Sequence, residues 1–296
     1  MHFFRSLLAS AVVLYHTAHA LTPVGHTPSG KPIYIAPNGS KAKQVDSDFK
    51  IFAPNGTLIH TFANIVPKSS KERSPAGLLR RQGLSNAGAS VSLTNTSDLL
   101  EAFNTSMTIP PNPATFDSQL MWMSASVIAA DDTGAPFASV RAVIQYGASA
   151  LQGGPFWTIA AQLELLPDAG GILQIAPIGF DPTVSVGTTI PTSITHRDEG
   201  DDLFWYLALF DSIPGGPQIE VGFVNPVVSA VAGMEEEGVT QSSDYPLEPF
   251  RFEKTNLALT SGFPDIEWNV SVDPVSEAYV TVDVDGSENA EISIHF

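Results

Sequence analysis

Two stretches of alternating side chains stand out in the hydrophobic pattern of this chain, and a Gly-rich segment joins them. In residues 140–146, Val, Ala, Ile and Tyr alternate with a second set that includes Arg141 and Gln145. In residues 157–165, Trp, Ile, Ala and Leu alternate with a more polar set that ends at Glu164. Because strand side chains point alternately to the two faces of a sheet, both stretches are predicted to be strands with one apolar face and one face that bears polar groups.

Short strands of this kind recur over the rest of the chain. Gly, Pro or Asp turns separate them, and helical character is confined to one short segment, residues 97–103. The predicted strands cover residues 117–129, 137–147, 156–166, 171–176, 183–188, 203–211, 217–224, 226–235, 249–260, 264–272, 277–284 and 289–295. Regularly spaced short strands predict an all-β fold in which two large antiparallel sheets pack as a β-sandwich of the jelly-roll type.

The first residues have the features of a secretion signal. The apolar run Leu7–Tyr15 follows Arg5, and Ala18-His19-Ala20 gives the small-x-small pattern of a cleavage site. The run is too short to span a bilayer, so residues 1–20 are predicted to be a signal peptide. No later segment is long and apolar enough to cross a membrane, and we expect the mature protein to be secreted, extracellular and monomeric.

A second processing signal, the dibasic pair Arg80-Arg81, coincides with a change of charge. Residues 21–81 hold nine Lys/Arg and three Asp/Glu, whereas residues 82–296 hold four Lys/Arg and 28 Asp/Glu. A basic segment before an acidic body predicts a propeptide over 21–81 that is held partly by charge. That attraction fades at low pH because carboxylates become protonated. A basic linker that is trimmed during secretion is the alternative interpretation.

The remainder divides into two parts. Residues 82–114 are predicted to be a polar linker or N-terminal segment that ends in Pro110-Pro111-Asn112-Pro113, and residues 115–296 are predicted to form the sandwich domain. Asn-x-Ser/Thr sequons mark surface positions in a secreted chain, and those in the expected mature chain are predicted glycosylation sites. The sequons are Asn38, Asn55 and the three of the expected mature chain, Asn95, Asn104 and Asn269.

Composition excludes several functions. The acidic body would repel the phosphates of nucleic acids, and its self-repulsion is least at acidic pH, where we expect it to work. The chain has no Cys, which excludes disulfides, thiol catalysis and Cys-ligated zinc. Beyond residue 81 the only histidines are His196 and His295. A Ser-His-Asp triad therefore has little support, because no Gly-x-Ser-x-Gly elbow is present to place its nucleophile.

Two acidic motifs need separate interpretation. Asp132-Thr133-Gly134 spells the aspartic-protease triplet, but that chemistry needs a second triplet to share the proton, and none is present. We therefore predict a hairpin turn there. The run Glu235-Glu236-Glu237 ends the predicted strand 226–235, and alternation places Glu235 on the face opposite to the apolar core. If that face also bears Gln145, the two side chains are predicted to lie near each other.

At these residues the chain resembles a known family. VIQYG at 143–147, followed by GGPFW at 153–157, is similar to the Leu-Gln-aromatic-Gly and Gly-Gly-x-(Phe/Tyr)-Trp signature of secreted fungal concanavalin A-like proteins related to the glutamic peptidases, or eqolisins. MEEEGVT at 234–240 and SDYP at 243–246 resemble a second block of that family. The resemblance covers residues 115–296 and implies a concanavalin A-like sandwich.

The resemblance also implies site residues. A catalytic Gln and Glu project from the concave sheet of glutamic peptidases, and by motif these are Gln145 and Glu235 here. The Glu then acts as general acid and base at acid pH, while the Gln amide donates to the oxygen of the tetrahedral intermediate. Neither a cofactor nor a metal is implied. Glu164 shares the polar parity and is a second candidate acid, whereas Ala232 stands where a further acid was expected.

Three functions remain open. The first is a secreted acid endopeptidase acting on polypeptides. The second is a non-catalytic protein that binds cell-wall glycans or has a structural role on the same sandwich; Asp283-Val284-Asp285-Gly286 resembles half of a Ca²⁺ loop, although an Asp-Gly hairpin explains it more simply. The third is a glycosidase, which needs two facing carboxylates and lacks the Glu-x-Asp-x-x-Glu strand expected for one.

Overall fold

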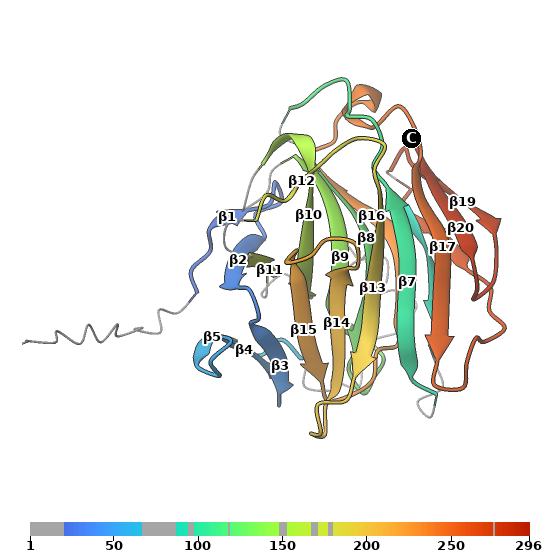
Figure 1. The fold of residues 1–296 in the computed structure, drawn as a ribbon. Coiled ribbons are helices and arrows are strands. Elements are labelled where there is room, and N and C mark those ends of the chain that lie inside the picture. The colour runs from blue at the N-terminus through green and yellow to red at the C-terminus, as the bar shows by residue number, and fades with distance from the viewer. Residues whose placement is uncertain are drawn as a thin grey trace, which may run out of the picture.

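The computed structural model describes residues 21–66, 87–93, 98–117, 119–147, 153–166, 171–176, 180–274 and 276–296 (Figure 1). The predicted signal peptide, the dibasic pair Arg80-Arg81 and the sequon Asn95 lie outside the described residues. None of the helical segments in the described ranges has the length and apolarity that a bilayer-spanning helix requires.

Two ten-stranded sheets build the described part of the chain, which confirms the all-β sandwich predicted from the alternation (Figure 1). Sheet A runs in the order β1 (Gly25–His26), β2 (Pro32–Pro37), β11 (Gly171–Ala176), β10 (Gly154–Leu165), β9 (Pro136–Gly147), β8 (Leu120–Ala130), β16 (Ser229–Glu237), β6 (Ala87–Ser92) and β18 (Asn269–Val272), with β12 (Thr183–Val184) paired to β10. Sheet B runs in the order β19 (Tyr279–Val284), β20 (Ala290–His295), β17 (Phe250–Leu259), β7 (Leu100–Thr108), β13 (Thr189–Arg197), β14 (Phe204–Phe210), β15 (Gln218–Phe223), β3 (Lys41–Val45), β4 (Asp48–Phe52) and β5 (Leu58–Phe62).

The core lies between the two sheets, and alternation decides which residues reach it. The predicted apolar faces of β9 and β10 are both in the core, including Tyr146 and Trp157, whose ring centroids are 5.1 Å apart. On β16 the residues of one parity, among them Ala232 and Met234, are also buried in this core. Glu235 therefore points away from it, as the sequence predicts.

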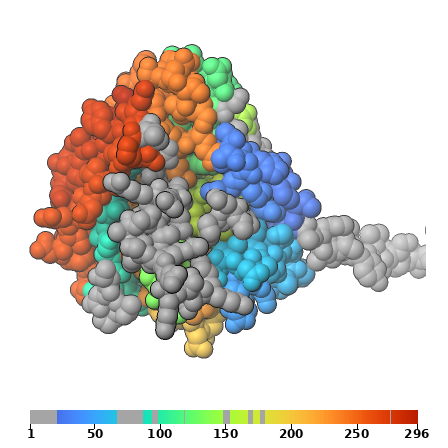
Figure 2. Space-filling view, turned by 180° about the vertical axis from the view of Figure 1, so that it is seen from behind, coloured from blue at the N-terminus to red at the C-terminus, as the bar shows by residue number. Residues whose placement is uncertain are grey.

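Residues 21–66 extend both sheets on the same side of the molecule, and Figure 2 shows them, coloured blue to cyan, on the flank opposite the C-terminal strands. β2 pairs with β11 and β3 pairs with β15, both in parallel, whereas all other strand pairs in the described residues are antiparallel. Phe49 of β4 is fully buried, with its ring centroid 6.0 Å from that of Phe137 and 5.8 Å from that of Phe223. The N-terminal segment is thus packed into the common core.

The structure corrects the prediction for residues 82–114. This segment contains β6, inside sheet A, and β7, inside sheet B, so the sandwich begins well before residue 115. The short helix predicted over 97–103 is also wrong, because strand β7 begins at Leu100. Both strands alternate small or polar residues with apolar ones, a pattern that resembles a linker when hydrophobicity is low. Among the predicted glycan positions, Asn269 is exposed on the edge strand β18, and Asn104 is half-buried in β7.

Candidate active site

Glu235 and Gln145 lie in one row that crosses four strands of sheet A. Glu235 of β16 pairs with Trp122 of β8, Trp122 pairs with Gln145 of β9, and Gln145 pairs with Thr158 of β10. Directly paired residues of antiparallel strands project from the same face. The two residues that the motifs single out therefore share a face, with the indole of Trp122 between them.

Hydrogen bonds to its oxygen hold the side-chain amide of Gln145 in place. Gln145 is 1% exposed, and its Oε1 accepts a hydrogen bond of 3.1 Å from Nε1 of Trp122. The Nε2 atoms of Gln162 and Gln174 also donate to this oxygen, over 3.4 and 3.5 Å. Because the oxygen and nitrogen of an amide point in opposite directions, these donors fix the orientation of the Gln145 NH₂ group.

Arg141 is the residue of this site to which sequence reasoning gave no role. It lies on β9, is 1% exposed, and donates from Nη1 to Oε1 of Glu235 and from Nε to Oε1 of Gln162, each over 2.8 Å. The same Nη1 is 2.8 Å from Oε2 of Glu164. The guanidinium also lies 5.3 Å from the ring centroid of Trp122, in cation–π range. One buried cation thus connects both candidate acids. The sequence signal for its role was an arginine inside an otherwise apolar strand.

Small side chains leave room for this arginine to cross the sheet. Between the row of Gln145 and the row of Arg141 lies a third row, in which Val143 pairs with Ser124 and Ser124 pairs with Gly233 of β16. A glycine and a serine project little from the sheet, so the long Arg141 side chain passes from β9 over β8 to β16. We call the side of sheet A that carries this cluster the polar face; it includes Arg141, Gln145, Gln162, Glu164, Gln174 and Glu235.

A loop from the N-terminal segment contacts the same face. Residues 27–31 form a tight turn in which the backbone N–H of Thr27 donates to the carbonyl of Lys31 over 2.9 Å, and we call them the Lys31 loop. Nζ of Lys31 donates to Oε1 of Glu164, whose side chain is fully buried. The backbone N–H and the hydroxyl of Ser29 donate to the carboxylate of Glu237, over 2.7 and 3.0 Å. The loop therefore links β10 to β16 over the polar face.

Burial governs the protonation of Glu235, which is 7% exposed. Removal from water raises its pKa to about 8; attraction to Arg141 lowers the pKa and only partly offsets this, while repulsion by Glu164 raises it further. With the Lys31 loop in place, Glu235 is thus a neutral acid at acidic and neutral pH. A proton donor on the same face as an oriented amide is a suitable arrangement for general acid–base chemistry at a carbonyl group.

The second motif block fixes the chain directly after Glu235. Asp244 is fully buried, and its carboxylate accepts from the hydroxyl of Thr115 and from the backbone N–H groups of Thr240 and Gln241. These donors, the Thr115 hydroxyl first, lower the pKa of Asp244 to about 2. The ionised carboxylate therefore closes the loop that follows β16. This block of the sequence has a structural role that holds the strand of Glu235 in place.

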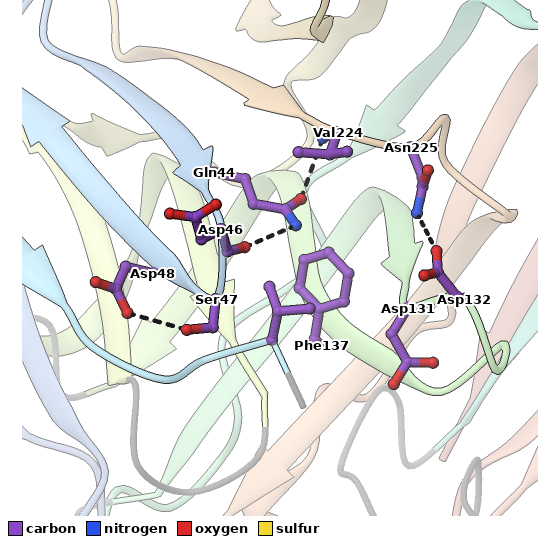
Figure 3. A pocket seen from close by; sticks show the side chains of 10 residues that line it. Gln44, Asp46, Ser47, Asp48, Asp131, Asp132, Phe137, Val224 and Asn225 are labelled. Carbon is purple, nitrogen blue, oxygen red and sulfur yellow. Dashed lines mark hydrogen bonds between the residues drawn. The ribbon is translucent and has the colours of Figure 1, made fainter. Parts of the chain in front are cut away.

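A separate cavity of about 700 Å³ lies away from the polar face, between the β3–β4 turn and the β8–β9 turn (Figure 3). Polar groups of its lining form hydrogen bonds with one another: Asn225 donates to Asp132 over 3.0 Å, and Gln44 accepts from the backbone of Val224 over 3.1 Å. Acidic side chains are numerous there, but within the described residues no three metal-ligating side chains converge anywhere. Asp131 accepts from Thr133 and Ala135, which confirms that the Asp-Thr-Gly triplet is a hairpin turn.

The two histidines that remained after sequence analysis lie outside the polar face. His196 of β13 packs against the ring of Tyr206, with centroids 5.7 Å apart. His295 of β20 stacks on Tyr279 at 4.5 Å and shares a hydrogen bond with Thr281. Both belong to sheet B, so neither can activate a nucleophile on the polar face of sheet A.

No family model matches the chain, and no curated protein matches it. Similar solved structures are those of Scytalido-glutamic peptidase with a transition state analog inhibitor (14% identity, TM-score 0.45) and with a peptide-based transition state analog (13%, 0.43). A third is SCP-B, a member of the eqolisin family of peptidases, in complex with the tripeptide Ala-Ile-His (13%, 0.39). Each comparison covers 72% of this chain and 98% of the other. These are peptidases of the family that the two motif blocks resemble.

Proposed function

We propose that this chain is a secreted acid endopeptidase of the glutamic-peptidase type, with Glu235 as general acid and base and Gln145 as the group that stabilises the oxyanion. The observation that carries the proposal is their common row on the polar face, with Trp122 orienting the amide of Gln145. Neither a metal nor a cofactor takes part in this chemistry, and the substrate is a polypeptide.

The reaction follows from the two groups. Glu235 takes a proton from a water molecule, and the water oxygen forms a bond to the scissile carbonyl carbon. The carbonyl oxygen becomes an oxyanion, which accepts a hydrogen bond from the NH₂ group of Gln145. As the C–N bond breaks, Glu235 returns the proton to the leaving nitrogen. Charge and protons balance over the cycle, and the Glu235 carboxylate that began it is regenerated.

The acid optimum follows from how the site opens. Burial is the largest cause of the high pKa of Glu235 in the closed site. Displacement of the Lys31 loop admits water, so the pKa falls toward the unperturbed value of 4.5. A general acid–base group works best at a pH near its own pKa. We therefore expect an optimum on the acid side of neutrality.

Residues 21–81 are proposed to be a propeptide, removed after cleavage at Arg80-Arg81. Support comes from the contacts of the Lys31 loop with Glu164 and Glu237, which place basic and polar groups over the polar face. Because β2 and β3 pair with strands of the body, cleavage of the chain alone does not release this segment. Release requires these contacts to weaken, as acid does when it protonates the carboxylates.

The test is proteolysis of an acid-denatured protein at pH about 3 to 4, near the ordinary pKa of Glu. The processed wild type is compared with Gln145→Ala and Glu235→Gln, and each variant is expected to lose at least about 100-fold in kcat. Glu236→Gln is the matched control, because it makes the same chemical change one position along, on the opposite face of β16. A folded, processed wild type without proteolytic activity would refute the proposal.

One observation favours a second function. Oε1 of Glu235 is engaged by Arg141 at 2.8 Å, an arrangement that also suits a non-catalytic relative that binds cell-wall glycan or has a structural role. In that case the processed protein would bind oligosaccharides on a glycan array and cleave no denatured protein at any pH from 2 to 7. The same processed sample serves both assays, so the two functions are separated directly.

A further inference from the structure

One of the two cations that contact Glu164 comes from the N-terminal segment, residues 21–66. The two carboxylate oxygens of Glu164 contact different cations: Oε2 lies 2.8 Å from Nη1 of Arg141, and Oε1 accepts from Nζ of Lys31. Arg141 belongs to β9, in the middle of sheet A, whereas Lys31 belongs to the loop between the edge strand β1 and its neighbour β2. A fully buried carboxylate needs donors, and the body alone supplies one cation for Glu164 and Glu235 together.

Lys31 enters this position in the way a side chain of a bound peptide would. Its side chain is 16% exposed although it comes from a surface loop, so most of its aliphatic stem and its ammonium are enclosed. The loop that carries it lies against the face on which Gln145 and Glu235 project, with Ser29 anchored at Glu237. A substrate that reaches both groups must lie against this same face.

A second observation points to a ligand with several donors. Oε1 of Gln174, on the strand next to that of Glu164, is buried and has no hydrogen-bond partner among the described residues. An ammonium group has three donors and one compact charge. Glu164 accepts one of these donors, and Gln174 is a further acceptor on the polar face. The planar guanidinium of a bound arginine would have to fit beside the guanidinium of Arg141, which already contacts Glu164. The site therefore favours lysine over arginine.

We propose that Glu164 forms a subsite for a lysine side chain of a bound polypeptide, and that Lys31 occupies this subsite in the present structure as a substrate lysine would. The subsite itself is a binding property of the folded chain. Its consequence for cleavage, a preference for lysine at one substrate position, rests on the proposed peptidase function.

The binding arm uses the full chain and requires no catalysis. Lys31→Ala removes the ammonium and leaves its position accessible, and n-butylammonium matches the missing group. At a concentration several times its Kd, n-butylammonium is expected to raise the Tm of Lys31→Ala by about 2 to 4 °C over the same ionic strength of KCl. Neutral n-butanol should not do so, nor should n-butylammonium act on the wild type, where Lys31 occupies the position.

Two control variants test whether the shift comes from an ammonium group bound beside Glu164. Lys31→Met fills the position with an uncharged chain of similar length, and Lys31→Ala combined with Glu164→Gln removes the charge that attracts the ammonium. Both are expected to show no specific shift with n-butylammonium. An equal shift in Lys31→Ala and Lys31→Met, or the absence of any shift in Lys31→Ala, overturns the subsite.

The cleavage arm uses the processed protein and pairs of peptides that differ by lysine or norleucine at one position. At one position we expect kcat/KM to be at least about tenfold higher for lysine, and Glu164→Gln should reduce this ratio to near one. Equal rates for both peptides at every position overturn the specificity. Failure to cleave any peptide overturns the peptidase function, while the n-butylammonium result then decides on the subsite alone.

Discussion

Nη1 of Arg141 lies 2.8 Å from Oε1 of Glu235, although the strands of these two residues are separated by β8. The contact is possible because the row between them contains Ser124 and Gly233, whose side chains project little. A single cation, itself 1% exposed, therefore contacts Glu164 on β10 and Glu235 on β16. A change at any one of these three residues is expected to alter the electrostatic environment of the other two.

Replacing the central cation should destabilise the chain strongly. Arg141→Met keeps most of the side-chain volume but leaves Glu164 and Glu235 without their common partner. Removal of one member of a buried ion pair costs about 3–5 kcal/mol. We expect a fall of that size in the free energy of unfolding at pH 7, measured by urea denaturation with an unchanged m-value.

A double-mutant cycle separates this coupling from lost packing. In the Arg141→Met background the carboxyl group of Glu235 has already lost the Nη1 donor, so Glu235→Gln removes no further contact with Arg141. The combined loss should therefore be smaller than the sum of the single losses by at least about 1 kcal/mol. Additive losses would mean that Arg141 acts through packing alone, and that the contact with Glu235 contributes nothing.

Glu235 should make the chain more stable in acid than at neutral pH. Its pKa is about 8 in the folded chain and 4.5 when unperturbed. Between these values the folded state holds a proton that the unfolded state has released, so stability is greatest below about pH 4.5 and falls as pH rises to about 8. The slope approaches about 1.4 kcal/mol per pH unit. Unfolding measured from pH 4.5 to 8 should show this fall in the wild type, and a flatter profile in Glu235→Gln.

Asp244 should have the opposite effect on the pH dependence of stability. Its pKa is lowered from 3.8 to about 2 by the Thr115 hydroxyl and by backbone donors, so its contribution is complete above pH 3.8 and is lost as pH falls toward 2. Asp244→Asn should lower stability at pH 5 by about 1.5–3 kcal/mol, the value of hydrogen bonds to a charged group. The variant should also lose less stability than the wild type between pH 4 and 2. Parallel profiles for the two proteins in that range would contradict this role.

The sequence predicts local features of the site well. Period-two alternation gives the faces of β9, β10 and β16, because which way a strand residue points is a local property. Alternation alone cannot show that Glu235 and Gln145 share a row, since the register of β16 against β8 joins residues about a hundred positions apart. The role of Arg141 depends on the same register, because only pairing brings Glu164 and Glu235 within its reach.

Other differences have local physical causes. Strand β13 was not predicted because Pro191 and several Thr and Ser residues interrupt its apolar pattern. Pro191 is tolerated because it lies one residue before the stretch of β13 that pairs with β14. Its carbonyl accepts from the backbone N–H of Asp211, just beyond β14, and its missing N–H, on the same side of the strand, removes no ladder bond. The pairing of β2 and β3 with the rest of the sandwich is parallel and non-local, so the sequence does not show with which strands they pair.

Trp122 is expected to act on catalysis through Gln145. Trp122→Phe keeps an aromatic ring beside Arg141 and removes the Nε1 donor that holds Oε1 of Gln145. The amide then has one fewer contact to fix its orientation, and we expect kcat to fall about tenfold with KM changed less than twofold, because the oxyanion contact is made in the transition state. Steady-state kinetics at acid pH provide the measurement. A rise in KM with unchanged kcat would instead assign Trp122 to substrate binding.

Phe49 should control how firmly residues 21–66 are held. Its ring is fully buried between Phe137 and Phe223, so Phe49→Ala leaves a cavity in the common core, and such substitutions cost about 3–5 kcal/mol. We expect Phe49→Ala to lower the Tm of the full chain and to speed dissociation of the N-terminal fragment after cleavage at the dibasic pair, as measured by size exclusion at pH 4. Leu58→Ala is the matched control, because Leu58 lies in the same segment and is exposed. Equal retention of the fragment in both variants would mean that the Lys31 loop and strand pairing hold the segment without help from its aromatic core.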